Sequence, residues 1–273
     1  MSKLIHIVIP VHNRKDFTRN CLNELYKQNY SNFKIIIIDD GSTDGTADMI
    51  RKLYPEVVII NGNGNLWWTK ATNIGVDYAL KDKAEYILTL NNDVIPYHDY
   101  LLNMILALED ETNSIIGSFA IDVYTGKPLY GGEIINWKSA KSTYIIDSLE
   151  IEQMKGLHEV NCLPGRGMLI PSHIFYKIGL FDEIHLKHYL ADFDFSSRAF
   201  HNGYKLYCNH DAKLKIYPEE SGAAANLRNK SIKSFLSHIW GRKGAGNIKD
   251  LFYFGINNCP RKYILLFIPI GII

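Results

Sequence analysis

Short apolar runs alternate with helically spaced apolar residues through the first part of the chain. Three strand-like runs, at 3–9, 33–38 and 57–60, carry at most one charged residue each. Between them, apolar residues recur every three or four positions, as on one face of a helix: Phe17, Cys21, Leu22, Leu25 and Tyr26, then Met49, Ile50 and Leu53. We expect the order strand, helix, strand, helix, strand, with Pro10 ending the first strand.

The alternation continues to residue 121, with a helix at 71–80, a strand from Tyr86, a helix at 97–108 and a strand at 114–121. Strands that alternate with helices through short connections form parallel sheets. The pattern therefore predicts the α/β class, with a mostly parallel central sheet and flanking helices. Glycines break the pattern between 122 and 159, which favours hairpins and a mobile loop.

A second group of elements follows residue 160. A strand is expected at 168–171, with Ser172 as the N-cap of the next helix. A further helix begins near Asp192 and ends near Asn202.

Composition narrows the function classes. The chain has 273 residues, of which 47% are hydrophobic, so one large α/β domain or one domain with an appendage fits. A formal net charge of +1 gives no global argument for nucleic acid as a partner. Four cysteines without a CxxC pair suit a reducing compartment. The first ten residues do not read as a signal peptide, and no run is long enough to span a bilayer, so a cytoplasmic location is expected.

The strand from Tyr86 ends in the polar residues Asn91, Asn92 and Asp93. Open α/β sheets bind ligands at the carboxyl ends of their strands, and Mg²⁺ and Mn²⁺ prefer oxygen ligands. We expect Asp93 to hold such a metal against a diphosphate. The alternative is that these residues cap the helix expected near Tyr97.

The second strand ends in two carboxylates, Asp39 and Asp40, which a turn rich in glycine and hydroxyl groups follows. The topology brings this turn to the same edge as Asn13 and Asp93. The chain has neither GxGxxG nor GxxxxGK[ST], so it has no dinucleotide fingerprint and no P-loop. Asp40 is expected to recognise a base or ribose, and Asp39 to shape the turn; turn formation by both is the alternative.

A loop of glycines and asparagines, including Asn65, leads into the pair Trp67 and Trp68. Adjacent residues cannot face the same way in regular structure, so one indole is expected to pack inward and one to line a pocket for a sugar. Asn73, near the start of the next helix, is expected to reach back to the nucleotide.

A second chemical cluster begins at Gly165, Arg166 and Gly167. Asp192 falls in the first turn of a later helix, where the helix dipole favours an ionised carboxylate, as a general base requires. Helix capping is the alternative for Asp192 and the preferred interpretation for Asp194. Arg166 is expected either to contact donor phosphate or acceptor or to be a surface arginine.

These motifs, taken in order, resemble glycosyltransferase family 2, which has the Rossmann-like GT-A fold. The resemblance covers roughly residues 3–220. It rests on five segments: the opening strand and turn with Pro10, Val11, His12 and Asn13; Asp39–Thr46; Asn91–Asp93 in the place of a DxD motif; Gly165–Leu169; and Ala191–Asp192.

The resemblance implies a nucleotide-sugar donor, a divalent metal (Mn²⁺ or Mg²⁺) and inversion at the anomeric carbon. Carried over to this chain, Asp40 would contact the base, Asp93 would bind the metal, and Asp192 would deprotonate the acceptor hydroxyl. The other residues expected to contact the nucleotide or donor are Pro10, Val11, His12, Asn13, Asn65, Trp67, Trp68, Asn73, Asn91 and Asn92. The tryptophan loop resembles a subgroup that builds bacterial surface polysaccharides, including rhamnosyltransferases. A UDP- or dTDP-sugar donor and a glycan or lipid-linked acceptor are therefore expected.

The chain departs from the family pattern at three places. Asn91 replaces the first acid of DxD, and Ala191 replaces the glutamate that usually precedes the base. Pro218 stands where many relatives place a histidine near the metal, with Glu219 or Glu220 as substitutes. Metal dependence is the part of the mechanism that these departures affect most.

The expected domain spans 1–222, with a nucleotide-binding half (1–122) and an acceptor half (123–222). In the extension 223–273, one expected helical face is apolar and consists of Ile232, Phe235, Leu236, Ile239 and Trp240. The cations near this face are Arg228, Lys230, Lys233, Arg242 and Lys243. Arg261 and Lys262 then precede an apolar end at 263–273. This pattern is typical of an interfacial segment and favours peripheral attachment to the inner membrane surface. Packing on the core and a homodimer contact are the alternatives.

Two other functions remain open from the sequence. A sugar nucleotidyltransferase usually has a glycine-rich basic loop after its first strand, and His12, Asn13 and Arg14 lack the glycines. A non-catalytic nucleotide-sugar-binding subunit would agree with Asn91 and Ala191, although Asp93 and Asp192 are both retained.

Overall fold

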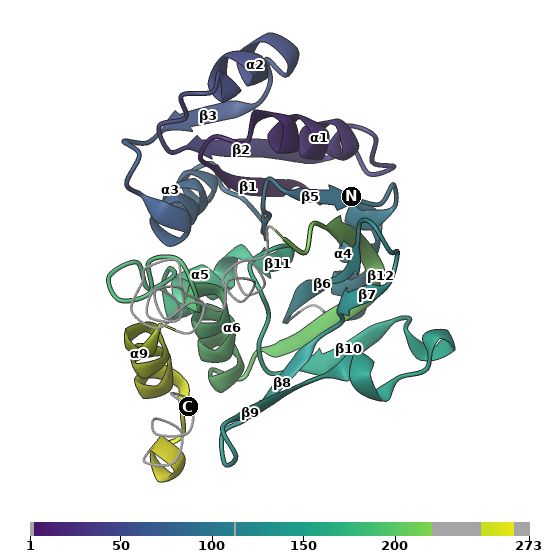
Figure 1. Cartoon of the computed structure of the whole chain (residues 1–273), viewed down its shortest axis with the longest axis vertical. Helices are drawn as coiled ribbons and strands as arrows, with labels where there is room; N and C mark the ends of the chain where they lie inside the picture. The colour runs from purple at the N-terminus through teal and green to yellow at the C-terminus, as the bar shows by residue number, and fades with distance from the viewer. Residues whose placement is uncertain (1–2, 112, 220–246, 265–273) are drawn as a thin grey trace.

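The computed structural model describes residues 3–111, 113–219 and 247–264 (Figure 1). The strands are β1 (Ile5–Val11), β2 (Phe33–Asp39), β3 (Val58–Asn61), β4 (Tyr86–Thr89), β5 (Val94–Pro96), β6 (Ser114–Asp122), β7 (Pro128–Tyr130), β8 (Glu133–Asn136), β9 (Lys141–Tyr144), β10 (Leu157–Val160), β11 (Met168–Pro171) and β12 (Lys205–Ile216). All but β8 and β9 belong to one sheet, whose main path is β10-β12-β6-β11-β4-β1-β2-β3.

Helices flank this sheet, as expected. They are α1 (Lys15–Leu25), α2 (Thr46–Leu53), α3 (Trp67–Lys81), α4 (Tyr100–Asp110), α5 (Ser172–Ile178), α6 (Ala191–His201) and α9 (Ile248–Asn258), with short 3-10 turns at η1 (Ile145–Ser148), η2 (Ile151–Gln153) and η3 (Arg261–Tyr263). In Figure 1, α1 and α2 lie above β2, whereas α3 lies below β1.

The parallel half of the sheet is built on β1, which pairs in parallel with both β2 and β4. Consecutive isoleucines make β2 apolar on both faces, as a strand covered by helices on two sides requires. The prediction that Pro10 ends β1 is wrong, because the strand continues to Val11. Pairing with β4 stops at Val8, so Pro10 faces only β2, opposite Ile38.

Strand β4 is central, but only one of its neighbours is parallel. It pairs in parallel with β1 and antiparallel with β11, opposite Met168 at Thr89. The sheet therefore changes direction next to the strand that carries Asn91, Asn92 and Asp93. The strand order β4-β1-β2-β3 also reverses between β1 and β4, and open α/β sheets bind their ligands at such a point.

Three predicted helix starts are wrong. Helix α3 begins at Trp67, not Ala71. The short strand β5 intervenes after Asp93, so α4 begins at Tyr100 and Asn91–Asp93 do not cap it. Ser172 is the first residue of α5, and no side chain caps that helix.

The β8–β9 hairpin extends from the lower edge of the sheet, and α9 lies beside α6 (Figure 1). Between them lies a small apolar cluster that includes Trp137, Phe193 and Phe254. No helix in the described ranges is long and apolar enough to cross a membrane. Glu220 and the predicted interfacial positions from Arg228 to Lys243 lie outside the described residues, as does the apolar end beyond 264.

Candidate functional site

The turn after β1 is fastened to the turn after β2. The Asn13 N–H donates to Oγ of Ser42 at 2.7 Å, and its side-chain oxygen accepts the Thr43 N–H at 2.9 Å. His12 Nδ1 lies 2.6 Å from the carbonyl oxygen of Asp40. Of the four residues predicted to contact the donor here, Pro10 and Val11 end β1, where Pro10 is partly buried and Val11 is buried. His12 and Asn13 supply the polar side chains of the turn.

The carboxylates of Asp39 and Asp40 accept hydrogen bonds from different backbone N–H groups. Asp39 accepts the Ser42 N–H at 3.0 Å, which confirms its role in the turn. Asp40 is only 6% exposed and accepts the N–H groups of Gly64 at 2.7 Å, Leu66 at 2.8 Å and Trp67 at 3.3 Å. It therefore anchors the loop that contains the exposed Asn65, and it satisfies N–H groups at the start of α3.

This anchoring explains why α3 begins early and includes both tryptophans. Trp67 has a φ of 61° and packs edge-on against His188, with ring centroids 5.8 Å apart. Trp68 packs edge-on against Phe181 at 5.5 Å, and its Nε1 donates to Oδ1 of Asn91 at 3.0 Å. The two indoles contact different partners, and Trp68 links α3 to the end of β4.

The three polar residues after β4 point to three different partners. Asn91 accepts from Trp68, whereas buried Asn92 donates to Oγ1 of Thr18 on α1 at 2.9 Å. The Asn92 amide therefore lies inside the protein and has a structural partner, and its contact with the donor stays a prediction. Asp93 accepts from Nη1 of Arg14 at 2.8 Å, and 17% of its side chain is exposed.

The glycine loop is tied to the same strand end. The Thr89 hydroxyl donates to the Gly165 carbonyl at 2.8 Å, and the Gly167 N–H donates to the Thr89 carbonyl at 2.8 Å. Gly167 has a φ of +92°, and a Cβ there would lie 2.1 Å from Oγ of Ser118. Gly167 therefore lies where neighbouring side chains leave no room for a Cβ, and its function is structural.

Asp192 lies in the first turn of α6, as predicted, and two backbone groups hold its carboxylate. The Gly165 N–H donates to Oδ2 at 2.7 Å, and the Phe193 N–H donates to Oδ1 at 3.0 Å. Burial raises the pKa of Asp192, whereas the backbone N–H groups, including those at the start of α6, and the charge of Arg166 favour the ionised form and oppose that rise.

Gly165 brings the two chemical clusters together. A Cβ on Gly165 would lie 2.3 Å from Cζ2 of Trp68 and 3.2 Å from Cβ of Asp192. The indole and the carboxylate therefore flank one glycine. The contacts run from Asn91 through Trp68 and Gly165 to Asp192, and they join the end of β4 to the start of α6 in a single site.

Arg166 and its neighbours extend the site toward β8. Its guanidinium lies 5.8 Å from the Tyr130 ring, and neither Nε of Arg166 nor the buried Tyr130 hydroxyl has a hydrogen-bond partner. Glu133 is 8% exposed. Burial raises its pKa, a hydrogen bond with the Ser142 side chain and the charge of Arg166 lower it, and the charge of Asp192 raises it further. The sequence analysis missed Glu133 and Tyr130, since the irregular region 122–159 has no periodicity that marks them.

Two other predicted positions make structural contacts. Asn73 is buried, and its amide donates to the Phe181 carbonyl and to Glu183 and accepts the Phe181 N–H, so these contacts hold it against the segment 181–183, and its reach to the nucleotide stays a prediction. Asp194 does not cap α6. It pairs with Arg198 at 2.8 Å and accepts from Asn257 and Asn258 of α9, which fastens α9 to α6.

Left-handed backbone conformations cluster in the loops that carry the candidate site. Six non-glycine residues in the described ranges have a positive φ, and four of them, Asn13, Arg14, Trp67 and Leu190, lie in the loops that carry the site. Such conformations persist where surrounding contacts over-determine them, often at functional sites.

The donor set at Asp93 fits a metal that is shared with a ligand. No group of three or more His, Cys, Asp or Glu side chains that could hold an ion occurs within 3–111, 113–219 and 247–264. Mg²⁺ typically takes one or two protein carboxylates and completes its shell with water and phosphate. Glu219, the predicted substitute ligand, accepts from the Tyr124 hydroxyl.

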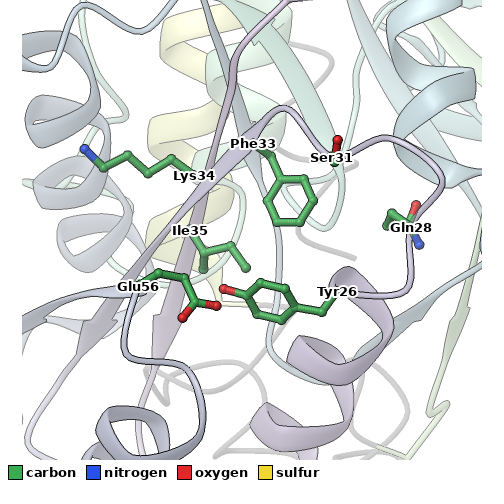
Figure 2. Close-up of a pocket in the computed structure, with 7 residues that line it drawn as sticks. All are labelled: Tyr26, Gln28, Ser31, Phe33, Lys34, Ile35 and Glu56. Atoms are coloured by element: carbon green, nitrogen blue, oxygen red, sulfur yellow. The ribbon is translucent and has the colours of Figure 1, made fainter.

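A hollow elsewhere in the molecule does not belong to this site. Figure 2 shows it between the end of α1, the start of β2 and the segment before β3, with Tyr26 pointing toward Glu56. It lies at the amino end of β2, opposite the edge formed by Asp39 and Asp40. Ligands of open α/β sheets bind at the carboxyl ends, so we do not place the donor in this hollow.

The chain matches the family described as Glycosyl transferase family 2 over residues 6–175. This span is more than half of its 273 residues, and the chain therefore belongs to that family. The expected GT-A fold is confirmed by a mannosyltransferase from Pyrobaculum calidifontis in complex with GDP-Man and Mn²⁺. The TM-score is 0.63 at 16% identity, over 98% of this chain and 68% of that one.

Curated relatives are more similar in sequence. The chain is 30% identical over 216 residues to an uncharacterized glycosyltransferase of Rickettsia prowazekii, covering 78% of this chain and 64% of that protein. It is 26% identical over 278 residues to a dolichyl N-acetyl-alpha-D-glucosaminyl phosphate 3-beta-D-2,3-diacetamido-2,3-dideoxy-beta-D-glucuronosyltransferase of Methanococcus voltae, covering 92% and 78%. The chain thus spans less than two thirds of the length of the Rickettsia relative.

Proposed function

We propose that this protein is an inverting glycosyltransferase that moves a sugar from a UDP- or dTDP-sugar to a hydroxyl of a glycan or lipid-linked acceptor. The observation that carries the proposal is the contact of Gly165 with both Trp68 and Asp192. It brings a partly buried, backbone-held carboxylate next to an aromatic side chain at the ligand-binding edge of a GT-A sheet.

Asp192 is the proposed general base. Its two oxygens accept backbone N–H groups from different elements, which orients the carboxylate and leaves further lone pairs for an acceptor hydroxyl. A raised pKa makes an ionised carboxylate a better proton acceptor than an exposed aspartate. The acceptor oxygen would lose its proton to Asp192 as it attacks the anomeric carbon from the face opposite the leaving diphosphate.

The donor is proposed to lie along the loops after β1, β2 and β4. Asp40 would present the loop 64–67 to the base and ribose and use its remaining lone pair for the base. Trp68 would face the sugar, since the C–H faces of sugars pack on aromatic rings. Asp93 would hold a divalent metal that neutralises charge on the departing diphosphate.

The acceptor is proposed to approach from the side of β8 and α6, where Glu133 and Arg166 lie near Asp192. A lipid-linked acceptor agrees with the dolichyl phosphate in the name of the Methanococcus voltae relative. A role in bacterial surface polysaccharide synthesis, with a rhamnosyl or related donor, follows from the resemblance of the tryptophan loop alone.

A donor screen tests the proposal. Purified protein is incubated with UDP-, dTDP- and GDP-sugars, with and without Mn²⁺, and scored for thermal shift and slow donor hydrolysis. We expect a Mn²⁺-dependent response to one donor that Asp93→Ala abolishes. Asp77→Ala, which removes an exposed carboxylate on α3, is the matched control and should retain the response.

Proton NMR of the product formed with that donor then gives the anomeric configuration. Inverted configuration supports single displacement with Asp192 as base, and retained configuration rejects it. If a donor binds but is not turned over with any lipid-linked acceptor tried, the result would support the alternative function, a non-catalytic binding subunit.

A further inference from the structure

Arg14 and Asp93 form an ion pair between the turn after β1 and the end of β4. Arg14 lies in the turn between β1 and α1, and its Nη1 lies 2.8 Å from Oδ2 of Asp93, beyond the end of β4. Asn13 and Arg14 both adopt left-handed backbone conformations, with φ of 59° and 64°. The turn, which Ser42 and Thr43 fasten, directs the guanidinium back over the strand end.

The ion pair between Arg14 and Asp93 is of a kind that another partner can readily replace. The Arg14 side chain is 40% exposed and that of Asp93 is 17% exposed, and exposed ion pairs contribute little to stability. The positive charge of Arg14 also acts on Tyr189, opposing the rise in pKa that burial gives its hydroxyl. Arg14 therefore lies between the end of β4 and the segment that leads into α6.

A guanidinium cannot bind a cation, but its planar donors match phosphate oxygens in pairs. The carboxylate it holds is the one proposed to bind the metal, and Asn91 stands at the position where the DxD motif has its first acid. We propose that Arg14 is a diphosphate-binding residue that Asp93 holds in the donor-free protein. When the donor binds, the guanidinium leaves Asp93 for the diphosphate, and the carboxylate becomes available as a metal ligand.

This inference rests on the proposed function and makes two predictions of opposite sign for Arg14→Gln. Without nucleotide, Mn²⁺ binding followed by electron paramagnetic resonance should tighten several-fold, since a competing cation is removed. Binding of UDP, dTDP or GDP, followed by calorimetry in EDTA and in Mn²⁺, should weaken about tenfold or more, as the loss of a charge-assisted hydrogen bond implies.

Two further variants sharpen the test. Arg14→Lys keeps the charge but loses the planar fork, so its nucleotide affinity should fall between those of the wild type and Arg14→Gln. Arg19→Gln removes an equal charge from an exposed ion pair on α1 and should change neither affinity.

The outcomes separate this inference from the proposed function. Nucleoside diphosphate binding that Arg14→Gln leaves unchanged, or Mn²⁺ binding that it weakens, overturns the role of Arg14 while the transferase proposal stands. A wild-type protein that binds none of the three nucleotides, with or without Mn²⁺, overturns both.

Discussion

The N–H of Gly165 donates to Oδ2 of Asp192 at 2.7 Å, across 27 positions of sequence. The same glycine lies against the Trp68 ring, so no side chain larger than hydrogen fits between the indole and the carboxylate. The relationship fixes the position of the proposed base relative to the proposed sugar-binding side chain.

Gly165→Ala should therefore damage catalysis more than stability. A Cβ 2.3 Å from Cζ2 of Trp68 must push the indole or the loop aside. We expect turnover to fall about 100-fold, since shifts near 1 Å have that effect, and the free energy of unfolding to fall by about 1–3 kcal/mol. Steady-state kinetics and chemical denaturation measure the two effects.

The double variant Gly165→Ala with Trp68→Phe is the control. The smaller ring makes room for the methyl group, so part of the lost stability should return, as coupling between neighbours requires. Additive losses would show that the contact is not the cause.

The pH dependence of kcat/KM should report the ionisation of Asp192. Because burial raises its pKa above the ordinary 3.8, the acid limb should lie at higher pH than for an exposed aspartate, and activity should fall as pH decreases through it. Arg166→Gln removes a charge that lowers this pKa, so the acid limb should move to higher pH. Arg51→Gln on α2 should not move it; a downward shift with Arg166→Gln would contradict the account.

Asp40→Ala should release the loop that precedes α3. Three backbone N–H groups lose their acceptor, and we expect the free energy of unfolding to fall by about 2–4 kcal/mol together with a loss of donor affinity. Hydrogen exchange should accelerate at Gly64, Leu66 and Trp67. Asp48→Ala, an exposed carboxylate on α2, is the control, and unchanged exchange in Asp40→Ala would refute the anchoring role.

Asn91→Asp should strengthen metal binding. The new carboxylate can still accept from Nε1 of Trp68, and it supplies a second acidic oxygen ligand beside Asp93. Since ligand charge tunes the affinity of oxygen-ligand sites, we expect about tenfold tighter Mn²⁺ binding by electron paramagnetic resonance. Asn20→Asp adds the same charge at an exposed position of α1 and should not change Mn²⁺ affinity. Equal affinity in Asn91→Asp and wild type would argue against a metal at Asp93.

Much of the architecture could be predicted because it depends on local periodicity. The isoleucines of β2 and the helical spacing of Cys21, Leu22 and Leu25 each indicate one element, and alternation of elements implies a parallel sheet. The antiparallel insertion of β11 could not be predicted, because strand partners are chosen by packing between distant segments.

The sequence predicts that Asp192 and Trp68 belong to one site, but it does not predict the contacts between the two residues. Asp192 and Trp68 occur together, yet the glycine that joins them and the burial that raises the pKa of Asp192 follow only from the folded arrangement. Asn73 and Asn92 show the converse, since an amide near a strand or helix end can equally turn inward. Arg14 had no local signal beyond a polar turn, and its partner lies 79 positions away.

Asp192→Asn gives the most direct test of the central claim that Asp192 is the catalytic base. Asparagine keeps the shape and one acceptor oxygen but cannot take the proton, so we predict donor affinity by calorimetry within about threefold of wild type and turnover reduced by about 10²–10⁴. Asp194→Asn should instead lower stability, because Asp194 pairs with Arg198 inside the protein. Wild-type turnover in Asp192→Asn would contradict the account.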